Sequence, residues 1–217
     1  MNYNKHINNC FQEQIENIEN ILYYPWVGFN YQTHKTLVIG ESVYNWGKNE
    51  LERKEISKKF LKNKLFAQIV IYEQGILNPF KSRKFVRNIE KIFNKENSNI
   101  EFWESVSFHE FVQRPMESLN HRPNKIDYIN GAKILSNLLN ILKPRKCIFL
   151  GTSWSKFINI KNILSNNYLL EEKHFEKINN AYPKIIEIYE FNLKIYFIKH
   201  PSRGFNIEKW KNFIYEN

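Results

Sequence analysis

The stretch TLVIGESVYNWG at residues 36–47 decides the expected fold. It begins with a short run of β-branched and apolar residues that ends at Gly40, a pattern typical of a buried strand followed by a turn. A turn-like segment then leads into a long helical pattern of apolar residues from about Leu51 to Gln74. The segment therefore predicts a strand, a loop and a helix in that order.

A second unit of this kind surrounds CIFLG at residues 147–151. A helical pattern at about 126–142 precedes this expected strand, and another begins near Ser153. Between the two units, SVSFHEFVQ at 105–113 predicts a further strand. Strands thus alternate with helices along the middle of the chain.

The two ends of the chain carry patterns of their own. Near the C-terminus, KIIEIYEF and LKIYFIKH flank Asn192 and predict two consecutive strands in a hairpin. A final helix is expected over 207–215, with Trp210 and Phe213 on one face. At the N-terminus an amphipathic helix is expected over about 5–24. Its apolar residues recur at steps of three and four, at Ile7, Phe11, Ile15, Ile18 and Leu22.

This alternation predicts an α/β protein, a three-layer α/β/α sandwich around a mainly parallel central sheet. The sequence has no internal repeat or linker, so a single domain is expected over 1–217, with its core at about 30–215. In parallel sheets the ligand crevice lies beyond the carboxyl ends of the strands. Three post-strand loops are therefore expected to meet there, at 41–50, 109–123 and 200–206.

Composition excludes several classes of protein. With 217 residues, 42% of them hydrophobic and 25% charged, the chain can bury a full core without disulfides or metal, which excludes disordered and stapled miniprotein classes. Cys10 and Cys147 are too few for a four-cysteine zinc site or an iron–sulfur cluster. No apolar stretch approaches the roughly 20 residues that a bilayer crossing needs. We expect a cytoplasmic protein without membrane, metal or cofactor.

The net charge of +10 favours a polyanionic partner, although a solubilising background of lysines is the alternative interpretation. The stretch ERKEISKKFLKNK at 52–64 mixes signs and favours a solvated helix face over a nucleic-acid arm. KSRKFVR at 81–87 contains no acid. It is the best candidate for a phosphate-contacting surface outside the crevice, through Lys81, Arg83, Lys84 and Arg87.

Common catalytic signatures are absent from the sequence. It contains no P-loop, no Gly-rich dinucleotide fingerprint after a strand and no Gly-x-Ser-x-Gly elbow. No two of its histidines lie four residues apart beside a Glu, so metal-dependent hydrolysis has little support.

Two post-strand motifs remain, LVIGESVYNWG at 37–47 and YFIKHPSRGFN at 196–206, with KPRKCIFLGTSW at 143–154 between them. Their order and placement resemble the uracil-DNA glycosylase superfamily. Gly40, Glu41 and Tyr44 match the family's first motif, and the His-Pro-Ser that begins at His200 matches the second. The resemblance covers about residues 30–215.

The resemblance implies cleavage of an N-glycosidic bond in DNA without a cofactor. Glu41 would orient or activate water, His200 would hydrogen-bond the departing base, and Tyr44 would shape the pocket. Ser202 would grip a phosphate, while Arg203 or Phe205 would be the wedge that holds a flipped nucleotide out of the duplex. The implied DNA-binding segment comprises Pro201, Ser202, Arg203, Gly204 and Phe205.

The implied base pocket departs from the family's pattern. Ser42 stands where one branch has its water-activating Asp, and Val43 where the family has Pro. In the strand that commonly carries an Asn for the uracil edge, the nearest equivalents here are His109, Glu110 and Gln113. An ionised Glu110 carboxylate only accepts hydrogen bonds, so it cannot make the same pair. Uracil specificity is therefore not implied. The expected substrate-binding residues are Gly40, Ser42, Tyr44, Phe108, His109, Glu110 and Gln113.

Three functional hypotheses follow. The first is a DNA-binding, base-excision glycosylase-like protein that hydrolyses the bond to a flipped, altered base. The second is a catalytically inactive protein on the same fold that binds nucleic acid or a modified nucleotide, a loss for which Ser42 gives a reason. The third is an unrelated α/β enzyme that acts on a free nucleoside or another small molecule.

Overall fold

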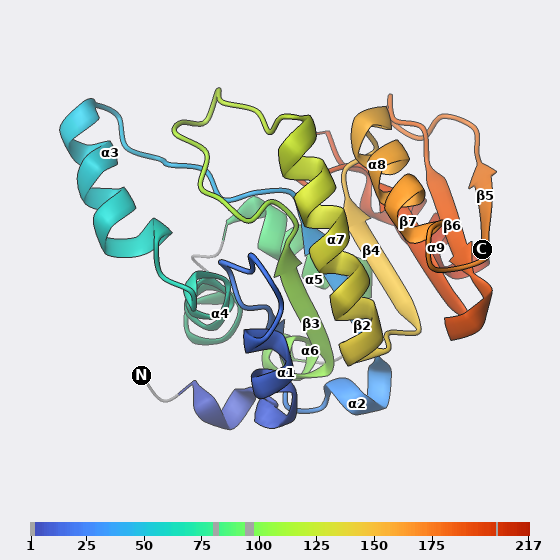
Figure 1. Ribbon diagram of the computed structural model, residues 1–217, viewed down its shortest axis with the longest axis horizontal. Coiled ribbons are helices and arrows are strands. Elements are labelled where there is room, and N and C mark those ends of the chain that lie inside the picture. The colour runs from blue at the N-terminus through green and yellow to red at the C-terminus, as the bar shows by residue number, and fades with distance from the viewer. Residues whose placement is uncertain (1–2, 80–82, 94–97, 203) are drawn as a thin grey trace.

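The computed structural model describes residues 3–79, 83–93, 98–202 and 204–217. Within these ranges seven strands form one sheet, in the spatial order β1-β3-β2-β4-β7-β6-β5 (Figure 1). The strands are β1 (Trp26–Val27), β2 (Thr36–Gly40), β3 (Val106–Glu110), β4 (Lys146–Leu150), β5 (Leu170–His174), β6 (Lys184–Ile188) and β7 (Leu193–Ile198).

The centre of the sheet is parallel. Strand β2 pairs in parallel with both β3 and β4, and β4 pairs in parallel with β7. The antiparallel pairs lie towards the two edges, where β1 joins β3, and β6 joins both β7 and β5. In this register Gly40 lies opposite Glu110, so the chain leaves β2 and β3 at the same edge. The expected α/β class and mainly parallel sheet are confirmed.

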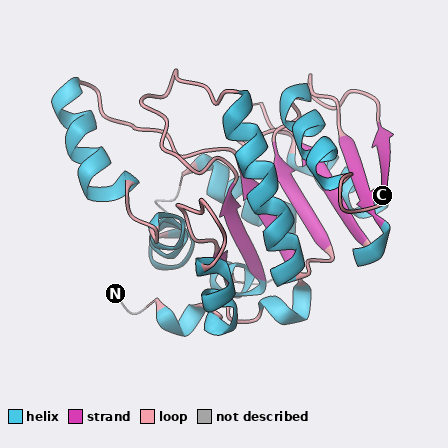
Figure 2. Ribbon diagram, viewed as in Figure 1, coloured by secondary structure: helices cyan, strands magenta, loops and turns pink. Residues whose placement is uncertain are grey.

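Helices cover both faces of the sheet (Figures 1 and 2). Side chains of successive strand residues point to opposite faces. Leu37 and Ile39 therefore join the core beneath α7 and α8, whereas Val38 joins the core beneath α5, α6 and α9. The layers are thus helix, sheet and helix. The described α-helices are α1 (Gln12–Glu16), α2 (Tyr31–His34), α3 (Glu50–Ile56), α4 (Phe66–Ile71), α5 (Lys84–Phe93), α6 (Asn99–Ser105), α7 (Lys125–Leu142), α8 (Trp154–Leu164) and α9 (Ile207–Glu216).

The continuous N-terminal helix expected over 5–24 does not form. Short 3-10 turns at Asn4–His6 and Asn9–Phe11 and the brief α1 take its place. Asn20 has a left-handed backbone, with φ of 61°, which a continuous α-helix excludes. Ile15 and Ile18 are nevertheless buried in the core. The apolar spacing therefore correctly indicated which residues are buried, but not the length of the helix.

The long helix expected from Leu51 to Gln74 is interrupted. Helix α3 runs into a π-helical turn at Ser57–Leu61, and α4 runs into another at Tyr72–Leu77. Between them Asn63 ends the first segment, because its side chain accepts a hydrogen bond from the amide of Leu65 (2.9 Å). Helix α3 projects from the body of the molecule (Figure 1).

The C-terminal expectations are confirmed. Strands β6 and β7 form an antiparallel hairpin, and Asn192 takes the left-handed conformation (φ 48°) where the chain reverses. Helix α9 follows and buries Trp210 and Phe213. Across the described residues, the helices are all too short or too polar to span a bilayer.

Candidate functional site

A cavity of about 500 Å³ opens beyond the carboxyl ends of β2, β3 and β7. Its volume falls within the range of about 300–1,000 Å³ that is usual for small-molecule sites. Seven of the residues expected from the sequence line it, namely Gly40, Glu41, Ser42, Tyr44, Phe108, Glu110 and His200. The three expected post-strand loops therefore each contribute to one cavity. Further lining comes from Val43, Trp46, Phe66, Val70, Arg83, Phe85 and Leu119.

Glu41 directly follows β2 and is held at both carboxylate oxygens. Its Oε1 pairs with the ammonium group of Lys156, and its Oε2 accepts a hydrogen bond from the hydroxyl of Tyr44 (3.0 Å). Burial acts to raise the pKa of Glu41, but Lys156, Tyr44 and His200 together bring the pKa below its ordinary value. Glu41 is therefore a carboxylate at neutral pH.

Lys156 was not expected in the site. It lies in the first turn of α8, its side chain is only 8% exposed, and a Cβ on Gly151 would lie 2.6 Å from its Nζ. Gly151, with φ of +152°, therefore leaves the space through which Lys156 reaches Glu41. The sequence signal was a lysine just inside a helix that follows a buried parallel strand, where an ammonium group requires a partner.

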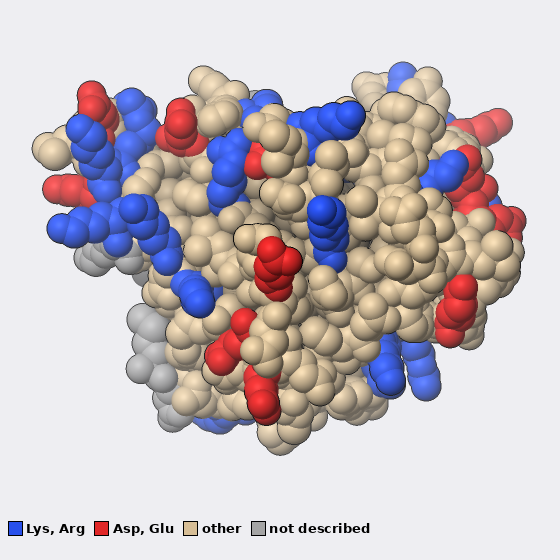
Figure 3. Space-filling view, viewed as in Figure 1, with Lys and Arg blue, Asp and Glu red and all other residues tan. Residues whose placement is uncertain are grey.

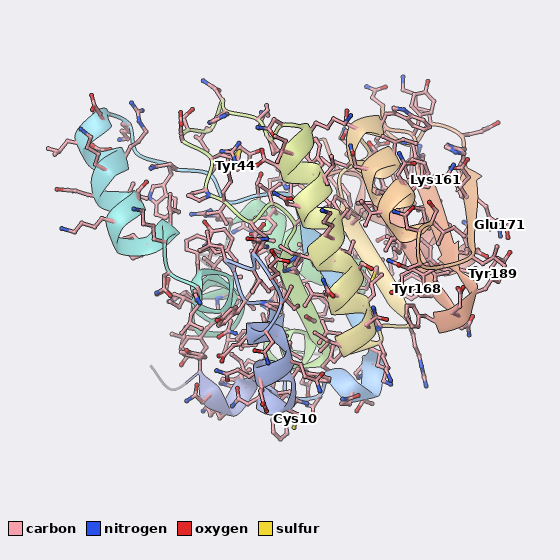
Figure 4. The ribbon with its side chains drawn as sticks, in the orientation of Figure 1. Cys10, Tyr44, Lys161, Tyr168, Glu171 and Tyr189 are labelled. Carbon is pink, nitrogen blue, oxygen red and sulfur yellow. The ribbon has the colours of Figure 1, made fainter. Side chains whose placement is uncertain are left out.

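Tyr44 lies on the segment between β2 and α3, far from the labelled cluster of Tyr168, Glu171 and Tyr189 (Figure 4). Its hydroxyl accepts a hydrogen bond from Arg122 (3.0 Å), and the guanidinium carbon of Arg122 lies 5.5 Å from the centre of its ring. Arg122, Tyr44, Glu41 and Lys156 thus form one continuous polar chain at the cavity wall. The contacts with Lys156 and Tyr44 fix the direction in which the Glu41 carboxylate faces.

His200 follows β7 and also lines the cavity. Its Nδ1 lies 3.0 Å from the hydroxyl of Ser202, and its ring centre lies 6.1 Å from that of Phe85. Burial is the main cause that lowers the pKa of His200; Glu41 raises it and Lys156 lowers it further. His200 is therefore a neutral imidazole at neutral pH. When Ser202 donates to Nδ1, Nε2 carries the proton and is a hydrogen-bond donor.

The carbonyl group of Pro201 attaches the loop after β7 to helix α5. It accepts a hydrogen bond from the side-chain amide of Asn88 on α5 (2.6 Å), and Pro201 itself is buried. The loop is thereby attached to the helical layer that also carries Phe85.

Glu110 ends β3 and lines the cavity while only 9% exposed. Burial is the main cause that raises its pKa, Arg83 opposes the rise and Glu41 adds to it, and the result is a pKa of about 7. The expectation of an acceptor-only Glu110 therefore fails, because near neutral pH a large fraction of this carboxyl group carries a proton and can donate.

His109 and Gln113 lie outside the cavity lining, contrary to expectation. His109 lies between Phe108 and Glu110 on β3, so its side chain faces the other side of the sheet, level with Ile39. It is fully buried, its ring nitrogens have no partner among the described residues, and burial lowers its pKa to about 3. The side-chain oxygen of Gln113 is engaged by the amides of Leu22 and Tyr23, each at 2.8 Å.

The expected DNA-contacting residues are dispersed. Lys81 and Arg203 lie outside the described residues. Arg83 lines the cavity instead of lying outside it, with its guanidinium carbon 5.5 Å from the ring centre of Trp46, whereas Lys84 and Arg87 are exposed on α5. Gly204 is exposed with φ of 54°, and Phe205 stacks on Trp210 (6.0 Å between ring centres). Use of Phe205 as a wedge would break that stack.

Charge is unevenly distributed over the visible face. Lys and Arg side chains gather over α3 and along the edge at which the parallel strands end, whereas Asp and Glu predominate near β5 (Figure 3). The described residues include no group of three His, Cys, Asp or Glu side chains arranged to hold a metal ion.

Comparison of the sequence with models of known protein families and with curated proteins finds no match.

Proposed function

We propose that the protein is a DNA N-glycosylase that hydrolyses the bond between a flipped base and its deoxyribose. One observation carries this proposal: Glu41 and His200 line the same cavity, at the ends of β2 and β7, although they are 159 positions apart in the sequence. Their protonation states suit the reaction, since a carboxylate can accept a proton from water while a neutral imidazole donates a hydrogen bond.

The reaction follows from these two groups. A water molecule attacks C1′ of the sugar and passes one proton to Glu41, so that a C1′–O bond forms as the C1′–N bond breaks. The bonding electrons leave with the base, whose negative charge is delocalised onto a carbonyl oxygen attached to the ring. His200 donates a hydrogen bond to that oxygen, and the base takes a proton from solvent after release. Phe85 and Phe108 provide aromatic surface for the base within the cavity.

Lys and Arg near the strand ends support a nucleic-acid substrate, because cationic side chains that neutralise phosphates release counterions. Arg83 is the charged residue from the basic stretch that reaches the cavity lining.

The test uses oligonucleotides that carry uracil, hypoxanthine or xanthine, followed by alkaline cleavage of abasic sites. We expect strand breaks with at least one base, and a loss of at least about 100-fold in rate for Glu41→Gln and for His200→Ala. Matched controls are Glu50→Gln and His34→Ala, since both residues are exposed and outside the cavity lining. Intact strands throughout the panel would refute the proposal.

A second candidate is a protein that binds nucleic acid at this site without hydrolysis. The observation that favours it is the ion pair of Glu41 with Lys156, because a carboxylate with a lowered pKa is a weaker base. Binding measured against salt concentration separates the two. A steep logarithmic dependence without product identifies the binder, and turnover identifies the enzyme.

A further inference from the structure

The carboxyl group of Glu110 is a buried titratable group in the cavity lining that the proposed reaction does not use. Glu110 is buried at the end of β3, and its side chain makes no hydrogen bond or ion pair to any other residue in the described ranges. A buried polar group without a partner costs about 1–3 kcal/mol, more when it is charged. Its position in the lining leaves a ligand as the available partner.

We propose that Glu110, as its neutral acid, binds the lactam edge of a heterocyclic base, in which a ring N–H lies beside a carbonyl oxygen. A carboxylic acid has one donor and one acceptor side by side, so its O–H donates to the carbonyl oxygen while its C=O accepts from the ring N–H. This inference rests on the function proposed above, and it names the class of base that the cavity takes.

The surroundings of Glu110 favour the neutral acid. Burial raises its pKa to about 7, with a further contribution from the Glu41 carboxylate at the end of β2. Arg83, which precedes α5, acts in the opposite direction. Tyr23 from the N-terminal segment is the other titratable neighbour, and its own pKa is raised mainly by burial and also by Glu110.

Gly40 and two aromatic residues line the cavity together with this carboxyl group. A Cβ on Gly40 would lie 2.8 Å from Oε2 of Glu110 and 3.0 Å from Cζ of Phe108, so a larger residue there would displace the Glu110 carboxyl group. The Phe85 and Phe108 rings lie 6.4 Å apart, centre to centre, and both line the cavity. A planar base fits this combination of an apolar surface and one edge-binding group.

The experiment measures binding of free uracil by calorimetry, which needs neither DNA nor turnover. The wild type should bind uracil about tenfold more weakly at pH 8 than at pH 6, because the protonated fraction of a group with a pKa near 7 falls by that factor. 1,3-Dimethyluracil, which lacks both ring N–H groups, should bind at least about tenfold more weakly than uracil at pH 6.

Two variants separate recognition from packing. Glu110→Gln keeps a donor and an acceptor at every pH, so it should bind uracil equally well at pH 6 and pH 8. Glu110→Leu removes both groups and should lose binding at both pH values. Glu117→Gln is the matched control, since Glu117 is exposed and outside the cavity lining. This variant should bind uracil with the same affinity as the wild type at each pH.

The outcomes decide between the proposals. Uracil binding with this pH dependence, together with intact oligonucleotides, would refute the glycosylase but support lactam recognition by Glu110. Equal wild-type affinity at pH 6 and pH 8, equal binding of 1,3-dimethyluracil and uracil, or loss of binding in Glu110→Gln would each overturn the role of Glu110. An oligonucleotide with uracil, compared with the same strand carrying cytosine, shows whether the base is taken free or within a strand.

Discussion

Lys156 on α8 forms an ion pair with Glu41 at the end of β2, and both side chains are largely buried. Two elements that are distant in sequence thus place opposite charges in a region of low polarity, where their attraction is strong. The pair keeps Glu41 ionised at the cavity wall. It also makes each residue depend on the other, because either charge alone would be buried without compensation.

Lys156→Met should lower the free energy of unfolding by about 3 kcal/mol, because it leaves the Glu41 carboxylate without its ammonium partner. It should also raise the pKa of Glu41. Urea denaturation measures the first effect. Lys161→Met is the matched control on the same helix; its pair with Glu172 (2.9 Å) is about one-third exposed, and its loss should cost less than about 1 kcal/mol. Equal losses in the two variants would contradict the prediction.

Glu110→Gln should be more stable than the wild type at pH 8. The folded protein holds the Glu110 proton up to a pKa of about 7, whereas the ordinary value is 4.5. The contribution of Glu110 to the free energy of unfolding should therefore be greatest below pH 4.5. It should fall by about 3 kcal/mol as the pH rises through 7. The variant should lack this fall. Parallel stability curves over this range would show that Glu110 ionises normally.

His109→Leu should remove a source of acid sensitivity. Burial lowers the pKa of His109 to about 3 from an ordinary 6.5, so the unfolded chain binds a proton that the folded chain does not. Stability from this group is complete above pH 6.5 and decreases as the pH falls towards 3, by on the order of 4 kcal/mol. Denaturation at several acid pH values measures the slope. The exposed His34→Leu serves as the control and should keep the wild-type slope.

Tyr44→Phe should reduce glycosylase kcat/KM by about tenfold, because it removes the hydroxyl that joins Arg122 to the Glu41 carboxylate. The pKa of Glu41 should rise, which an NMR titration of its carboxyl carbon detects. Stability should change by no more than about 1 kcal/mol. Tyr182→Phe, at an exposed ring, is the control. An unchanged Glu41 titration would contradict this role for Tyr44.

The strands β2, β4, β6 and β7 were predictable, because TLVIG, CIFLG and the segments around Asn192 are rich in β-branched and apolar residues and are bounded by turn residues. The sequence wrongly predicted one continuous N-terminal helix. The same apolar spacing is compatible with the successive short helical turns that the structure has, whose apolar side chains are buried in the same core. The sequence patterns also did not predict the short strands β1 and β5. Strand β5 is polar at every residue after Leu170 and lies at the edge of the sheet, so burial leaves little pattern in its sequence.

The sequence by itself determined which residues follow the strands, and so placed Glu41, Glu110 and His200 near one edge of the sheet. Only the tertiary structure decided that Lys156 reaches Glu41, that His109 faces away from the cavity, and that Glu110 holds a proton near neutral pH. The physical reason is that ionisation depends on burial and on charges from distant segments, and neither is encoded in local spacing.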